Sequence, residues 1–270
     1  MAKSDSVIKL RGKFGDQVHV NGKYGPSVRQ APKDGSKKDE AALEEQYTRT
    51  AYLNNLASEL NRIIRVYSGT LKPTGFYQLL QKRFRKEPLN NRFMLLKQLE
   101  GMEVNSNYPL HKLGDARVTV TTNQKKIIVK LEVLYHPSPY VGTHKVNCYF
   151  YEVTMVCWTN GDGAVSHARQ FGEWISLKDG LPDFEFEFNR PADTVHWLVC
   201  LKQQAGINEE PIPSFCAEGM QIISVGTFNK KDLELFTKRK EEKTAQDEKA
   251  AATKKQEQVT RVKAKTKRKL

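Results

Sequence analysis

The segment from Asp183 to Phe188 reads DFEFEF, so three phenylalanines alternate with three acidic residues. Successive side chains of a β-strand point to opposite faces, which places Phe184, Phe186 and Phe188 on one face and the acids on the other. Such alternation is typical of a strand that buries one face and exposes the other. The segment therefore predicts an antiparallel sheet that covers a hydrophobic core.

The two-residue period continues on both sides of this segment, from Arg117 to about Phe228. No long helical pattern separates the apolar runs, so parallel crossover connections are not expected. We expect about seven strands, and packing two sheets together is the simplest way to bury their inner faces. The sequence thus predicts an antiparallel, immunoglobulin-like β-sandwich over residues 107–228.

Residues 40–105 follow a different period and predict a helical section. Between Leu43 and Tyr67, apolar residues recur at three- and four-residue steps, and Gly69 and Pro73 then end the pattern. Two shorter helices are predicted at about 74–85 and 90–102, and short connections favour packing among the three. Together with the sheets, this section makes the predicted fold class α+β.

Residues 1–35 form a glycine-rich arm that predicts a β-hairpin. Asn21-Gly22 lies between short β-prone runs, and this dipeptide favours a type I′ turn because both central residues need positive φ. An isolated hairpin is only marginally stable in water. The arm must therefore pack on its own chain or on a neighbouring one.

Residues 229–270 form a Lys-rich tail, predicted to be helical or disordered and detached from the folded body. The tail holds 15 Lys and Arg against 7 Asp and Glu, and this excess of 15 − 7 = +8 is most of the chain's net +13. A cationic segment gains affinity for a polyanion by releasing condensed counterions, without fixed geometry. The alternative is a solvated tail and a solvated helix face. The predicted polyanion-binding residues are Arg261, Lys263, Lys265, Lys267, Arg268 and Lys269 in the tail, and Lys82, Arg83 and Arg85 in the second helix.

Signatures of catalysis are missing from the sequence, so we expect no enzyme, no cofactor and no metal. It contains neither a Gly-x-x-x-x-Gly-Lys-Ser/Thr loop nor a Gly-x-Ser-x-Gly elbow. A constellation of His167, His196 and Cys200 is not favoured, because Cys200 lies in an apolar run without an activating base. With no export signal and no apolar run near 20 residues, we expect a cytoplasmic protein with reduced cysteines and no membrane span.

Aromatic residues support one further hypothesis about the function of the predicted sandwich. The Pro-stiffened segment 135–142 carries aromatic residues, and Trp158 and Trp174 lie in or beside predicted strands. Aromatic side chains at the end of a sandwich can bind a glycan or a peptide. Filling of the core is the commoner role for such tryptophans.

Several short motifs occur from the N-terminal arm to the late strands: Gly12-Lys13-Phe14-Gly15 with Val18, then Val28-Arg29, Pro32, Gln46 and Arg49, and later Asp193-Thr194-Val195-His196. These motifs resemble those of an uncharacterised family of Bacteroidota proteins, a domain of unknown function. The resemblance covers roughly residues 7–60 and, more loosely, 117–227. It implies an architecture of glycine-rich hairpin, helix and C-terminal β-sandwich, and it implies no activity.

The sequence favours a non-enzymatic binding or assembly protein whose basic tail contacts DNA or RNA without sequence specificity. A structural component of a phage-like or other large multi-subunit assembly is the main alternative, in which the N-terminal arm adds strands to a neighbour's sheet. Partners would then be copies of the chain itself or other assembly subunits. A glycan- or peptide-binding sandwich is the third hypothesis.

Overall fold

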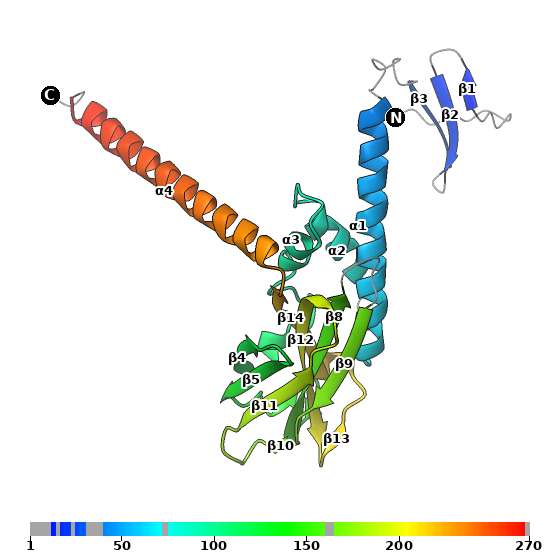
Figure 1. The fold of residues 1–270 in the computed structure, drawn as a ribbon, viewed down its shortest axis with the longest axis vertical. Helices are drawn as coiled ribbons and strands as arrows, with labels where there is room; N and C mark the ends of the chain where they lie inside the picture. The colour runs from blue at the N-terminus through cyan, green and yellow to red at the C-terminus, as the bar shows by residue number, and fades with distance from the viewer. Residues whose placement is uncertain are drawn as a thin grey trace. The chain divides into compact units, whose positions relative to one another are not determined.

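The computed structural model of the chain describes residues 12–14, 17–22, 25–30, 40–71, 75–159 and 165–267. Side chains are described as far as Glu248 and, within the first thirty residues, only for residues 17–20, 28 and 30. The chain divides into two compact units, residues 1–52 and 53–270, which are taken separately below. Helices and antiparallel sheets are both present, which confirms the α+β class (Figure 1).

The first unit holds a three-stranded antiparallel sheet in the order β1-β2-β3, with β1 at Gly12–Phe14, β2 at Gln17–Gly22 and β3 at Gly25–Gln30. The predicted turn at Asn21-Gly22 is wrong, because both residues belong to β2 and Gly22 pairs with Gly25. The strand pairing therefore continues through this dipeptide. Register follows from pairing along the whole strands and not from the most turn-prone dipeptide.

The second unit contains two larger antiparallel sheets. In the six-stranded sheet, β8 pairs with β12, β9 and β10 also pair with β8, and β13 and β14 also pair with β12. The three-stranded sheet has the order β11-β5-β4, and β6 pairs with β7. The bounds are β4 Asp115–Thr122, β5 Lys126–Tyr135, β6 Tyr140–Val141, β7 His144–Lys145, β8 Cys148–Thr159, β9 Val165–Phe171, β10 Ile175–Ser176, β11 Asp183–Asn189, β12 Thr194–Ile207, β13 Glu210–Pro211 and β14 Glu218–Thr227.

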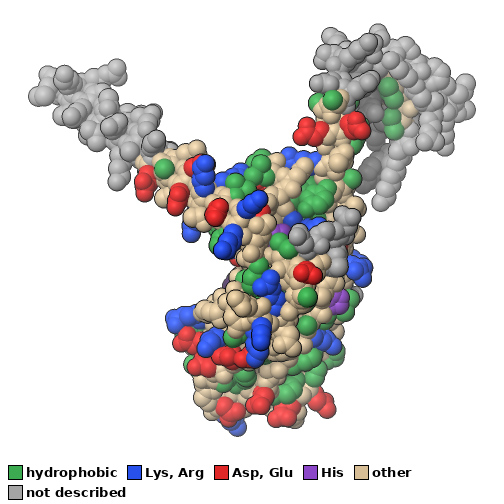
Figure 2. All heavy atoms as spheres, in the orientation of Figure 1, with side chains coloured by type: hydrophobic (Ala, Val, Ile, Leu, Met, Phe, Trp, Pro, Cys, Tyr) green, Lys and Arg blue, Asp and Glu red, His purple; other side chains and the backbone are tan. Residues whose placement is uncertain are grey.

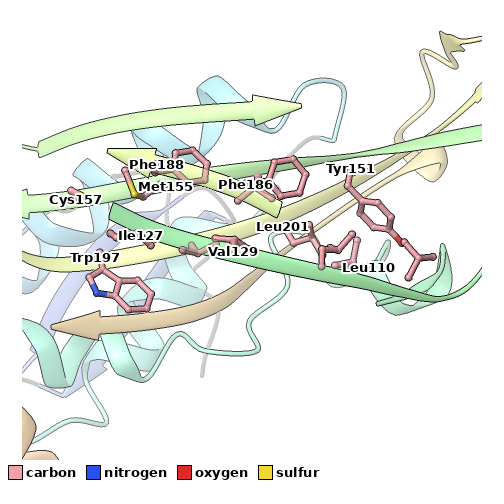
Figure 3. Close-up of a cluster of buried hydrophobic side chains, with 14 of the residues drawn as sticks. Leu110, Ile127, Val129, Tyr151, Met155, Cys157, Phe186, Phe188, Trp197 and Leu201 are labelled. Carbon is pink, nitrogen blue, oxygen red and sulfur yellow. The ribbon is translucent and has the colours of Figure 1, made fainter. Parts of the chain in front are cut away.

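One hydrophobic core lies between these two sheets (Figure 3). Phe186 and Phe188 of β11 are buried in it, and Phe184 packs against it partly buried, as the DFEFEF pattern predicts. The acids on the other side of β11 are exposed, and Glu185 pairs with Lys130 at 3.0 Å. The main residues contributed by the opposite sheet are Tyr149, Tyr151, Val153, Met155, Cys157, Trp197, Val199 and Leu201.

Helices cover the other face of the six-stranded sheet. Helix α1 (Glu40–Tyr67) buries its apolar side chains from Leu53 to Tyr67, whereas Tyr47 is 71% exposed. Trp158 of β8 donates from Nε1 to Glu59 Oε2 at 3.2 Å, which ties this helix to the sheet. Because both faces are covered, nearly every residue of β8 and β12 is buried.

Two shorter helices complete this layer, α2 at Phe76–Phe84 and α3 at Arg92–Lys97. Asn91 caps α3, since its Oδ1 accepts from Met94 N at 3.0 Å. The predicted third helix extends too far, because the chain after Lys97 turns to pair with the edge of β14. Gly101 N donates there to Ile222 O at 2.8 Å. Two short 3₁₀ helices, η1 at Leu110–Lys112 and η2 at Phe215–Ala217, lie in the connections.

The C-terminal segment forms a helix, α4, from Lys230 to Lys267. Within the described part of the chain, no helix combines the length and apolar character needed to cross a membrane.

Candidate functional site

The start of α4 is defined by a local cap. Asn229 Oδ1 accepts from Lys231 N at 3.1 Å, and Asn229 O accepts from Leu233 N at 3.2 Å. Asparagine at this position satisfies N–H groups that have no partner within the helix. Asp232 in the first turn also suits the positive end of the helix dipole. The cap at Asn229 therefore starts the helix shortly after the end of β14.

The first turns of α4 are anchored on the folded body. Asp232 is 9% exposed, and its Oδ1 accepts from Asn91 Nδ2 at 2.7 Å. About one turn further along the helix, the Phe236 ring packs edge-on against Phe93, with 5.8 Å between the ring centroids. The ammonium group of Lys97 lies 5.3 Å from the centroid of the same ring. The expectation of a detached tail is therefore wrong for its first turns.

An ion pair joins α4 to the segment that follows α2. Arg239 Nη1 lies 2.6 Å from Glu87 Oε1, and Glu87 is only 3% exposed. Glu87 also accepts from Gln98 Nε2 at 3.3 Å, so its carboxylate links three segments. This contact brings α4 to the segment that directly follows the basic residues of α2.

The predicted basic residues of α2 have the exposure that a binding surface requires. Lys82, Arg83 and Arg85 are all exposed, and the first two lie in the last turn of the helix. Figure 2 shows Lys and Arg side chains, interspersed with Asp and Glu side chains, around the start of α4. The link from this cluster to α4 is the ion pair of Arg239 with Glu87, which follows Arg85 by two residues.

The predicted tail residues fall mostly beyond the described side chains. The backbone at Arg261, Lys263, Lys265 and Lys267 is helical, and Arg268 and Lys269 lie outside the described residues. Residues 240–248 are all exposed. Among the tail side chains described, from residue 230 to 248, Arg239 forms an ion pair with a carboxylate of the body.

Of the three residues in the constellation considered above, His167 lies on β9, and His196 and Cys200 lie on β12. Burial lowers the pKa of His196 to about 4, against an opposing effect of Asp232, so the imidazole is neutral near pH 7. Cys200 is completely buried, and this burial raises its thiol pKa. His167 Nδ1 instead contacts the Tyr67 hydroxyl. His167 thus connects β9 to the end of α1, and His196 stacks on Phe93 of α3.

A buried cluster of charges, which the sequence did not reveal, lies on the helix-covered face of the sheet. Lys202 Nζ is 3.3 Å from Glu218 Oε2 and 4.0 Å from Glu152 Oε2, and all three residues are at most 4% exposed. Arg169 Nη1 lies 3.8 Å from Glu152 Oε1. Burial raises the pKa of Glu152, while Lys202 and Arg169 act in the opposite direction. Glu218 also accepts from Thr70 Oγ1 at 2.8 Å, so the cluster clamps the end of α1 to the sheet.

The two tryptophans singled out from the sequence occupy different environments. Trp158 is fully buried, so the core reading is right for this residue. Trp174 is half-buried and packs edge-on against Phe150, with 4.6 Å between ring centroids. Phe171 lies 6.2 Å from Phe150 and is 54% exposed. These three rings form an aromatic cluster with an exposed edge.

Among the residues that the structure describes, no group of three or more His, Cys, Asp or Glu side chains is placed to hold a metal ion. Comparison with models of known protein families, with curated proteins and with solved structures finds no match.

Proposed function

We propose that the protein binds a polyanion, DNA or RNA without sequence specificity, through the basic C-terminal helix and the cluster of cations on α2, and that it does so without catalysis. The observation that carries the proposal is the anchored cationic helix. Helix α4 joins the body through Asp232, Phe236 and Arg239, and its backbone continues to Lys267 through the acid-free basic segment that follows Glu257.

Anchoring favours the proposal because it limits the freedom that binding must remove. A fully flexible tail loses conformational entropy when it settles along a polyanion, whereas a helix fixed at one end has less to lose. Thirty-eight helical residues span about 57 Å. Thirteen basic and seven acidic residues are thus held on one element.

The aromatic content of the tail supports binding to the backbone rather than to the bases. Phe236 is the only aromatic residue between positions 229 and 270. Its ring packs against Phe93, where it serves the anchor of α4. Base stacking by proteins that bind single strands needs accessible aromatic rings. Recognition through phosphates alone carries no sequence information.

Binding of a random duplex, followed by fluorescence anisotropy over a range of salt concentrations, tests the proposal. Deletion of residues 258–270 removes the six terminal cations, and the log–log salt slope should become shallower by about 5, from roughly 0.9 per phosphate contact. Replacing Lys82, Arg83 and Arg85 with glutamine should reduce the slope further.

The matched control replaces three exposed lysines elsewhere, Lys112, Lys145 and Lys178, with glutamine. This variant changes the net charge by the same amount as the α2 variant. Absence of binding at low salt, or equal slopes for the α2 variant and this control, would contradict the proposal for the corresponding surface.

A role in a large assembly is a second proposal, supported by the separate first unit. Residues 1–52 form their own compact unit with a three-stranded sheet. Such a sheet can add its edge to that of a neighbouring subunit. Mass photometry of the intact chain and of a chain lacking residues 1–35 tests this role. A monomer in both cases removes it.

The exposed edge of the aromatic cluster supports a third proposal, a glycan- or peptide-binding site at Trp174. Binding on a glycan array that disappears in Trp174→Ala would support it. We also propose an immunoglobulin-like sandwich, supported by two antiparallel sheets around one core, and a cytoplasmic location.

A further inference from the structure

A cavity of about 460 Å³ opens at the base of α4, between the connection from β11 to β12 and the junction of β14 with α4. The two cations of this cavity, Arg190 and Lys231, take no part in the contacts of Asp232, Phe236 and Arg239 that anchor α4. Its lining residues are Arg190, Asp193, Thr194, Val195, Phe228, Asn229 and Lys231.

Arg190 is held in a defined orientation in the wall of this cavity. Its guanidinium carbon lies 3.7 Å from the centroid of the Phe228 ring, so the planar group is supported by an aromatic face. Nη2 donates to Thr194 O at 3.0 Å, which fixes the rotation of the group. The backbone is held too, since Arg190 N donates to Lys125 O at 2.7 Å.

The charges around the cavity favour an anion. Arg190 and Lys231 contribute two positive charges and Asp193 one negative charge, a balance of 2 − 1 = +1. A guanidinium carries five N–H donors in a planar fork that matches two phosphate oxygens. The hydrogen bond from Arg190 to Thr194 O uses one of its nitrogens, Nη2. Lys231 is exposed and belongs to the first turn of α4.

We infer that this cavity binds a phosphate group of the nucleic-acid backbone, with Arg190 as the oriented donor and Lys231 as a second cation. The inference rests on the proposed function and deepens it. Contacts along α4 are spread over many cations, whereas this site supplies one fixed contact where the helix meets the body. A phosphate bound here sets the point at which the polyanion meets the protein.

Charge variants of opposite sign test the site in the full-length chain with the same random duplex. Arg190→Gln and Lys231→Gln should each weaken binding about three-fold or more at low salt and make the salt slope shallower by about one. Asp193→Asn should strengthen binding, because it removes the negative charge from the cavity. Asp193 has φ of 60°, a conformation that asparagine tolerates.

Matched controls separate a local effect from the change in net charge. Lys145→Gln and Asp183→Asn make the same charge changes at exposed positions outside the cavity. Arg190→Lys keeps the charge and should keep the slope. If Arg190→Gln does not fold, Lys231→Gln and Asp193→Asn still decide the question, because both side chains are exposed.

Two results would overturn the inference while leaving the proposed function intact. One is a set of cavity variants that bind the duplex like their matched controls. The other is calorimetric binding of inorganic phosphate that depends on Arg190, together with unchanged duplex affinity, which would make the cavity a site for free phosphate. If the unaltered full-length chain does not bind the duplex, both proposals are overturned at once.

Discussion

Replacing Lys202 with methionine should destabilise the protein strongly, because Lys202 is the buried cation between two buried carboxylates. Its Nζ lies 3.3 Å from Glu218 and 4.0 Å from Glu152, and these carboxylate residues are 1% and 2% exposed. Methionine fills a similar volume, so the loss is mainly electrostatic. Removing one partner of a buried ion pair costs about 3–5 kcal/mol. Arg169 stays near Glu152, but its side chain is 46% exposed and compensates only in part.

The cost should depend on pH in a defined direction. Burial raises the pKa of Glu152 in the folded protein, and Lys202 and Arg169 oppose this rise. Without Lys202 the pKa rises further, so the folded state binds a proton more readily than the unfolded state does. Stability is then lost as the pH rises through the folded pKa and is regained on acidification. The variant should therefore lose less stability at pH 5 than at pH 7, and adding Glu152→Gln should restore part of the loss at pH 7.

Urea unfolding monitored by tryptophan fluorescence measures this effect, because Trp158, Trp174 and Trp197 all lie in the second unit. The exposed control Lys178→Met should change the free energy of unfolding by less than about 0.5 kcal/mol. A cost for Lys202→Met below about 1 kcal/mol, or an equal cost at pH 5 and pH 7, would refute the reasoning.

Three further outcomes are expected. Gly226→Ala should lower the free energy of unfolding by about 1–3 kcal/mol, and with it the urea midpoint, because a Cβ there would lie 2.1 Å from Cζ2 of Trp197. An unchanged urea midpoint would contradict this close approach. The wild-type free energy of unfolding should fall as the pH drops from 6.5 towards about 4, where unfolding lets the buried imidazole of His196 take up a proton, and His196→Gln should flatten this part of the curve. A thiol reagent followed by mass spectrometry should label half-buried Cys216 before Cys200, whose burial raises its pKa, and equal rates would argue against the described core.

The alternation of side chains along β11 and β5 was enough to predict both strands and their buried faces. Phe186 and Val129 are paired across these strands and point into the same core. The apolar face of α1 was likewise predicted, although it is buried only from Leu53 onwards. These predictions succeed because one strand or one helix carries its own periodic signal.

The pairing of strands that are distant in the sequence leaves no periodic signal of this kind. Glu152 and Lys202 lie opposite each other because β8 pairs with β12, and Glu218 joins them through β14. Each residue alone looks like an ordinary polar position on a strand. Neither the clamp at the end of α1 nor the cavity around Arg190 could therefore be predicted.

The sequence by itself determined the antiparallel strands, the helical section and the concentration of positive charge near the C-terminus, since local period and composition suffice for each. The tertiary structure decided that helices cover the second face of the six-stranded sheet and that α4 is anchored through Asp232, Phe236 and Arg239. These contacts join segments more than a hundred residues apart. Only the packed chain brings such groups within a few ångströms, where charge and burial act together.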